Sequence, residues 1–516
     1  MTCQFNLAQA LTALASNRLD DPNMQYWSSA ELTLYIQEAL REWNALTGYW
    51  RGDFTFSASQ QPWYDLTDTV NLPNTLRPMT VTDQYLYQVI EAHLIEPPPV
   101  QLVNTVTTLA ITSTGLFTPT VASVAGMSVG EFVTVDEGVN EERVEILAVQ
   151  DFPVLSFSAD FTKTHVSGVE VTSDFTWNGT TQFTLSDLVS AVQRGRDETL
   201  GVTGCFITKR SVAAALGIIS LPSTVIDIRR NVYIDSSGGV HYLWKSDPQA
   251  WLGYEGNYTS NPPGTPRTYS TSAEPVWSFD VDVPPLPGDY ELLTVETEAA
   301  LDFSDPSLLY VPDDWSWVIK WRALADLMGK ESEAKDVMRQ QYCEMRYQQG
   351  LKLLALSPAL LAMRINNQPV FIDSVKSADA YMLGWEGQTQ GQPKYALTSG
   401  LNLIALNPPP DSGNYSITAT VIQNAPVVAL NSDCLNLSND FVDVILDEAQ
   451  HLAAFKMGGA EFQATIPLHE RFIKQAAIYT SKVGQQGPFT RELWAMSQKQ
   501  EVMEPRLKED EEAKVG

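Results

Sequence analysis

The chain has 516 residues, and 33 Lys and Arg residues against 62 Asp and Glu residues leave a formal charge of −29 at pH 7. This length suggests about three to five compact units, and a hydrophobic fraction of 44% excludes a disordered chain. The acidic balance argues against broad binding to nucleic acid or to anionic membranes, because both need clustered Lys and Arg. Only 18% of the residues are charged, which is below the usual quarter, so we expect much of the surface to meet other protein.

The N-terminal region contains a segment that is repeated later in the chain. Residues 31–50, ELTLYIQEALREWNALTGYW, align without a gap with residues 187–206, DLVSAVQRGRDETLGVTGCF, so that Glu42 corresponds to Glu198. Each stretch follows a capping residue, repeats apolar residues at helical spacing and stops at a Thr-Gly pair. We therefore predict two copies of a helical unit, over residues 1–99 and 177–236.

Residues 100–176, between these copies, are rich in Thr, Val and Phe. Residues 131–135 and 143–146 alternate between apolar and polar side chains, as strands do, and residues 136–140 have the composition of a turn. The pattern predicts a small β domain that is inserted into the N-terminal helical region.

A second duplication occupies the C-terminal half of the chain. The sequence PPLPGDY at 284–290 is matched by PPDSGNY at 409–415, and each is predicted to form the turn of a hairpin between two strands. Two helices follow in each copy, and Arg346-Tyr347 corresponds to Arg471-Phe472 in the second of them. The predicted segments are β segments at 237–300 and 359–430 and helical hairpins at 301–358 and 431–484.

Residues 485–516 are predicted to form an extended acidic C-terminal tail. Four apolar residues of this tail are hypothesised to dock on a partner: Phe489, Leu493, Trp494 and Met496. The fold class predicted for the whole chain is α+β, with duplicated helical-hairpin units and small antiparallel β domains, one of them inserted in the N-terminal helical region.

The sequence offers little that supports catalysis. The match to G-x-S-x-G at 126–130 lacks the following helix that a nucleophile elbow requires, so we interpret it as a turn. The five histidines are scattered, and the four cysteines lie far apart with no C-x-x-C pair. We therefore expect no enzyme activity, no metal site and no cofactor, and we expect the cysteines to be reduced thiols.

Two further features have structural interpretations. Asp313-Asp314 come at the start of a predicted helix, where carboxylates favour the positive end of the helix dipole, so we interpret them as capping residues. The chain has no run of 18 apolar residues, and we expect neither a signal peptide nor a membrane span.

Four stretches resemble the head-to-tail connector proteins, of the adaptor or neck type, in tailed-bacteriophage virions. They are residues 29–50, residues 182–204 with 221–230, residues 311–325 and residues 342–347. The resemblance implies helical-hairpin subunits with β additions in a twelve-fold ring below the portal, through which DNA passes without sequence-specific binding. It also implies the portal protein and downstream tail or nozzle proteins as partners, and a place in the virion neck or tail after synthesis in the host cytoplasm.

Three other functions stay open. Thirteen tryptophans with many carboxylates are also the composition of a glycan hydrolase, although Trp43, Trp315, Trp317 and Trp321 recur at spacings that favour helix packing. A receptor-binding protein would carry its function on the β domains, and a further possibility is another structural protein of the tail or baseplate. We expect the connector function because the repeated helical units dominate the sequence.

Overall fold

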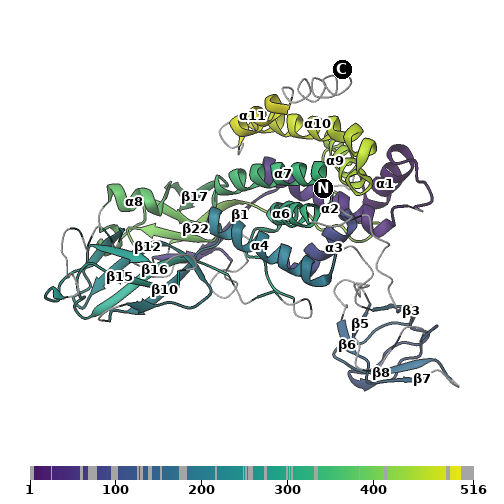
Figure 1. The fold of residues 1–516 in the computed structure, drawn as a ribbon, viewed down its shortest axis with the longest axis horizontal. Helices are drawn as coiled ribbons and strands as arrows, with labels where there is room; N and C mark the ends of the chain where they lie inside the picture. The colour runs from purple at the N-terminus through teal and green to yellow at the C-terminus, as the bar shows by residue number, and fades with distance from the viewer. Residues whose placement is uncertain are drawn as a thin grey trace. The chain divides into compact units, whose positions relative to one another are not determined.

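The structure is a computed structural model of the chain (Figure 1). It describes residues 5–24, 26–57, 62–67, 78–94, 103–124, 127, 129, 132–136, 142–150, 154–173, 183–215, 218–247, 249, 251, 253, 260–271, 276–297, 300–301, 303, 306–330, 335–382, 384–411, 415–483 and 489–500. The chain divides into a small unit, residues 95–187, and a large unit made from the residues on either side of it.

The small unit contains the inserted β domain that the sequence predicts. Two sheets, with strand orders β3-β9-β5-β6 and β4-β8-β7, share a core that includes Val133 and Phe157. β5 and β6 pair antiparallel with Phe132 opposite Glu145, as the alternation of their side chains indicates. The strands are β3 (Asn104–Val106), β4 (Gly115–Phe117), β5 (Phe132–Val135), β6 (Glu142–Glu145), β7 (Ala148–Gln150), β8 (Ser156–Phe161) and β9 (Glu170–Ser173).

One continuous stretch of the large unit builds a sheet and three α-helices, which we call copy B. Its strand order is β10-β16-β12-β13-β14-β15-β11, and among the described pairs β13 and β14 are parallel while the others are antiparallel. The elements are α4 (Leu185–Thr203), β10 (Thr208–Ala213), β11 (Ile219–Ser220), β12 (Val225–Asp235), β13 (Val240–Lys245), β14 (Thr268–Thr271), β15 (Ser278–Val281), β16 (Gly288–Glu296), the 3₁₀ turn η4 (Asp313–Trp315), α6 (Ser316–Gly329) and α7 (Val337–Ala355).

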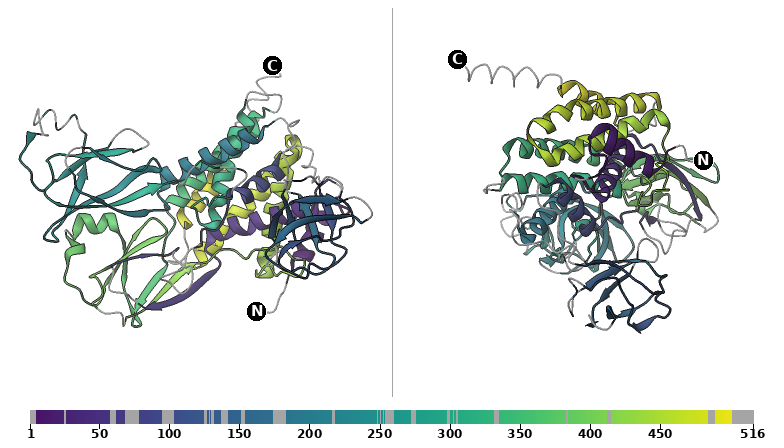
Figure 2. Two further views of the ribbon diagram at one scale, coloured as in Figure 1. Left: turned by 90° about the horizontal axis from the view of Figure 1, so that it is seen from below. Right: turned by 90° about the vertical axis from the view of Figure 1, so that its right-hand side faces the viewer.

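Two distant parts of the chain build a second body of the same kind, which we call copy A. Figure 2 shows the result in its left view, where the purple strand β1 lies along the edge of green strands from the C-terminal half. The N-terminal part supplies α2 (Ser29–Thr47), β1 (Arg51–Ser57) and β2 (Trp63–Asp65). The C-terminal part supplies β17 (Ala362–Ile365), β18 (Gln368–Pro369), β19 (Phe371–Ser374), α8 (Val375–Tyr381), the 3₁₀ turn η5 (Trp385–Gly387), β20 (Tyr395–Ser399), β21 (Leu403–Asn407), β22 (Ser416–Ile422), α9 (Asn439–Met457) and α10 (Gly459–Val483).

Copies A and B have the same connectivity and the same strand pairing. The strand after the first helix pairs antiparallel with the last strand, as β1 with β22 and β10 with β16, and the other neighbour of that last strand is β17 or β12. The parallel pair β19 and β20 corresponds to β13 and β14, and β21 lies against β2 as β15 lies against β11. Copy B is therefore inserted between β2 and β17 of copy A, and the two duplications of the sequence are parts of one repeat.

The first helix of each copy begins and ends as its sequence predicts. Ser28 caps α2 in a capping box with Glu31, which satisfies amide groups that have no partner inside the helix. Gly48 and Gly204 follow α2 and α4 with φ of 56° and 57°, a left-handed conformation that favours glycine and ends helices.

The hairpin predicted at each Pro-rich turn is wrong. β15 pairs with β14 and β11, whereas β16 pairs with β10 and β12, and β21 and β22 are separated in the same way. Proline has no amide hydrogen to donate to a strand partner, so the prolines at 284–287 and 408–410 connect strands that lie apart.

Outside the two copies lie α1 (Leu7–Thr12), the π-helical turn η1 (Ala13–Arg18), α3 (Asp83–His93) and α11 (Thr490–Gln500). The predicted extended tail is thus helical over residues 490–500, where α11 packs on α10 and buries Leu493. The acidic residues after 500 lie outside the described residues. None of the helices among the described residues is long and apolar enough to cross a membrane.

The cysteines differ in part from the expectation that all four are reduced. Cys205 and Cys343 are free and buried, but Cys434 is disulfide-bonded. Cys434 lies in a segment that pairs with the N-terminal residue Asn6, so the fold brings together parts of the chain that are more than 400 residues apart. Cys3 lies outside the described residues.

Helices α6 and α7 approach each other closely at Gly350, which suggests a test of their packing. A Cβ atom on Gly350 would lie 2.7 Å from Val318 Cγ2 and 2.9 Å from the ring of Trp317. We expect Gly350→Ala to lower the free energy of unfolding by about 1–3 kcal/mol, because a packed interior accommodates extra volume poorly. Chemical denaturation measures this loss. Gly253→Ala is the control, since nothing lies within 4 Å of that position, and equal losses in both variants would contradict the interpretation.

Candidate functional site

The strongest group of buried charges lies where copies A and B meet. Arg346 extends from α7 of copy B among α2, α9 and α10 of copy A, and it is 1% exposed. Its guanidinium donates to Glu42 on α2, and its Nη1 lies 2.7 Å from His469 Nε2 and 3.7 Å from Glu448 Oε1. The hydroxyl of Tyr342, one helical turn earlier, lies 3.1 Å from the same Nη1.

The charge states of this cluster follow from its burial. Burial by itself would lower the pKa of Arg346, but the carboxylate of Glu42 raises it above its ordinary value. Burial and the nearby guanidinium lower the pKa of His469 well below its usual range, so the imidazole is neutral. Because His469 Nδ1 lies 2.8 Å from Glu448 Oε2, we infer that Nδ1 donates to Glu448 and that Nε2 accepts from Arg346.

This cluster also contains a set of groups that could bind a metal ion. The ligand atoms of Glu42, Glu448 and His469 all lie within 4.8 Å of one another. The guanidinium of Arg346 lies among them and supplies the positive charge that buried carboxylates need. The geometry therefore describes an ion pair between two copies of a fold.

A second buried ion pair connects the helices of the copies, and a tyrosine of α3 bonds to its carboxylate. Lys320 on α6 of copy B lies 3.2 Å from Glu38 on α2 of copy A, and both side chains are at most 1% exposed. The hydroxyl of Tyr85 on α3 donates to the other oxygen of Glu38 at 2.8 Å.

Asp313 and Asp314 do not cap their own helix, contrary to our interpretation of the sequence. Asp313 accepts from the amide of Val81 at 2.9 Å and from the side chain of Asn424 at 2.7 Å. Asp314 accepts from the amide of Ala425 at 3.0 Å, and burial raises its pKa to about 7. The two carboxylates therefore bind segments that come before and after copy B in the chain. Their donors are distant in sequence, so the local pattern could not predict them.

A buried arginine also connects the sheet of copy B to α8 and η5 of copy A. Arg230 on β12 of copy B donates to Asp379 Oδ2 at 2.7 Å and to Glu386 Oε1 at 3.0 Å, both in copy A. The indole of Trp385 donates to Asp379 at 2.9 Å. Charge-assisted bonds of this kind are stronger and more directional than neutral ones, so Arg230 holds the sheet of copy B against α8 and η5 of copy A.

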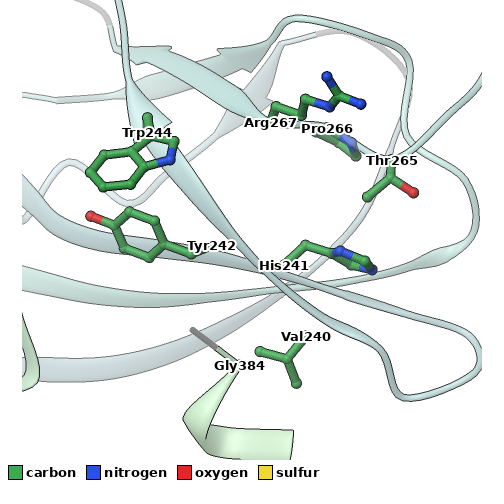
Figure 3. A pocket seen from close by; sticks show the side chains of 8 residues that line it. All are labelled: Val240, His241, Tyr242, Trp244, Thr265, Pro266, Arg267 and Gly384. Atoms are coloured by element: carbon green, nitrogen blue, oxygen red, sulfur yellow. The ribbon is translucent and has the colours of Figure 1, made fainter. Parts of the chain in front are cut away.

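A crevice of about 620 Å³ opens beside this contact. Figure 3 shows the rings of Tyr242 and Trp244 on one side and Arg267 on the other. Gly384, at the turn between α8 and η5, reaches it from copy A. His241 in its wall pairs with Asp235 at 3.0 Å, so the crevice presents aromatic rings and an arginine but no carboxylate pair for glycoside hydrolysis among its described lining residues.

The four residues proposed for docking on a partner have different surroundings. Phe489 and Leu493 are buried within the chain, and the ring of Phe489 lies 5.9 Å from that of Trp315. Trp494 is 36% exposed, and Met496 is half-buried. The docking function stays a prediction, and Trp494 is the member of the set best placed to contact another protein.

Sequence reasoning missed the buried clusters between the copies. The sequence did mark Arg346 and Glu42, because both belong to matched segments of the duplications. Alignment alone, however, does not show that one copy contacts the other. Gly126, Ser128 and Gly130 of the G-x-S-x-G match lie outside the described residues.

Residues 169–367 match the family described as SU10 adaptor protein, and this range contains all the elements of copy B. A comparison with curated proteins finds no match. The family match supports a phage structural adaptor-type protein and suggests a virion component.

The copy interface can be tested at Arg346. We expect Arg346→Leu to lower the free energy of unfolding by about 3–5 kcal/mol, because removing one partner leaves the buried charges of Glu42 and Glu448 without compensation. Arg194→Leu is the control. Arg194 is 60% exposed in its ion pair with Asp326, and its loss should cost about 0–1 kcal/mol. Equal effects in urea denaturation would show that Arg346 does not hold the copies together.

Proposed function

We propose that this chain is a structural virion protein of a tailed bacteriophage that forms a ring joining the portal to the tail. The observation that carries this proposal is that the match to the adaptor family spans copy B, while copy A repeats the connectivity of copy B. The interior of the large unit is held by ion pairs between structural helices, which suits a protein whose task is assembly.

The charge of the chain supports the passage of DNA through such a ring. A formal charge of −29 repels phosphate groups and gives no general affinity for the duplex. A channel wall of this sign would let DNA move without holding it. The proposed partners are therefore further copies of this chain, the portal protein, and tail or nozzle proteins.

Removing the chain from the phage tests this function directly. We expect infected cells that lack it to accumulate heads without attached tails, because the portal would have no surface on which to attach a tail. Electron microscopy of purified particles would show this defect, and a copy of the gene supplied in trans should restore tailed particles. Complete infectious particles without the chain would overturn the proposal.

The docking hypothesis for the C-terminal segment has a matched pair of variants. We expect Trp494→Ala to reduce incorporation of the chain into particles with little change in the free energy of unfolding, because this ring is partly exposed. Leu493→Ala, at a fully buried neighbour, should instead lower the free energy of unfolding by about 2–5 kcal/mol. Quantitative immunoblots of purified particles and chemical denaturation provide the two readouts, and normal incorporation of Trp494→Ala would reject a docking function for this ring.

A further inference from the structure

The ion pairs between copies A and B are asymmetric: in each of them copy B supplies the cation and copy A supplies the carboxylate. Glu42 of copy A pairs with Arg346 of copy B, and their counterparts in the repeat are Glu198 of copy B and Arg471 of copy A. Glu198 instead pairs with Arg322 of its own copy at 2.8 Å, and Arg471 pairs with Asp447 of its own copy. Within the described residues no ion pair joins Glu198 to Arg471.

The sheets show the same asymmetry at two equivalent arginines. Arg230 lies opposite Leu293 on β16, and Arg364 lies opposite Thr418 on β22. Leu293 and Thr418 each lie three residues after the tyrosine that ends the matched Pro-rich sequences. Arg230 and Arg364 are therefore the same position of the repeat.

Their surroundings are opposite. Arg230 is 5% exposed and pairs with carboxylates of copy A, whereas Arg364 is exposed and has no ion-pair partner in the described part of the chain. Beside Arg364, Phe371 on β19 is 74% exposed, and Trp244, at the equivalent position of copy B, is 55% exposed. Copy A thus leaves uncovered the arginine position that copy B buries against copy A.

A contact in which each partner uses a different face is heterologous. An isologous contact would repeat each pair, so Arg364 would have met copy B as Arg230 meets copy A. A row of units joined by heterologous contacts has one unused contact face at each end, and it closes into a ring when the rotation between neighbours allows.

We propose that the exposed face of copy A, centred on Arg364 and Phe371, binds copy B of a second molecule of this chain. The contact repeats between chains the arrangement that Arg230 makes within one chain. Each chain then fills two neighbouring positions of the ring, so the ring contains half as many chains as fold units, or six chains for twelve positions. This inference rests on the proposed ring function.

Charge reversal at Arg364 tests the surface. We expect the purified full-length wild-type chain to form closed rings, and we expect Arg364→Glu to shift it to single chains by mass photometry, with an apparent dissociation constant at least tenfold weaker. Since Arg364 is exposed, the thermal unfolding of the Arg364→Glu variant should match that of the wild type. Arg143→Glu is the control, because this substitution makes the same change of charge at an exposed position of the inserted β domain. Rings formed equally well by Arg364→Glu would overturn the proposed surface.

The count of chains in particles separates this inference from the proposed function. If each fold unit meets one portal subunit, quantitative mass spectrometry should find one chain for every two portal subunits. One chain for each portal subunit would overturn the assignment of two positions to one chain and leave the ring function standing. Absence of the chain from particles would overturn both.

Discussion

A charge buried in protein needs a partner, and for Arg346, Lys320 and Arg230 of copy B the partners lie on copy A. Arg346 and Lys320 of copy B would each be costly without Glu42 and Glu38 of copy A. Asp313 and Asp314 complete this arrangement with donors from segments before and after copy B. The copies are thereby joined in one defined relation, because a set of directional charged contacts allows few alternative orientations.

The path of the chain reinforces that relation. Copy B begins and ends within copy A, so α2 and β1 can complete copy A only when the C-terminal strands and helices have returned to them. Pairing of β1 with β22 places Arg51 opposite Ile422, 371 positions later in the chain, and Phe56 opposite Ile417, 361 positions later. The two copies are therefore not consecutive, independent domains. In the chain, the inserted β domain lies between β2 of copy A and α4 of copy B.

Such a construction suits the structural role proposed for the chain. Two units that share one continuous chain cannot dissociate from each other, and the interface between them consists of buried arginines, aromatic rings and carboxylates. The family match to copy B and the repeat of its connectivity in copy A are both consistent with a structural protein whose surfaces, more than any catalytic groups, carry its function.

The sequence by itself determined the repeated helices, their capping residues and terminal glycines, the inserted β domain and the α+β class, because helix ends and alternating strands are encoded by neighbouring residues. Only the tertiary structure decided that the two duplications form one nested repeat, that the Pro-rich segments do not turn hairpins, and that Arg230 is buried while its equivalent Arg364 is exposed. Those features depend on which distant segments meet. No local pattern records them, since the same residue type in the same register is buried or exposed according to what the rest of the chain places over it.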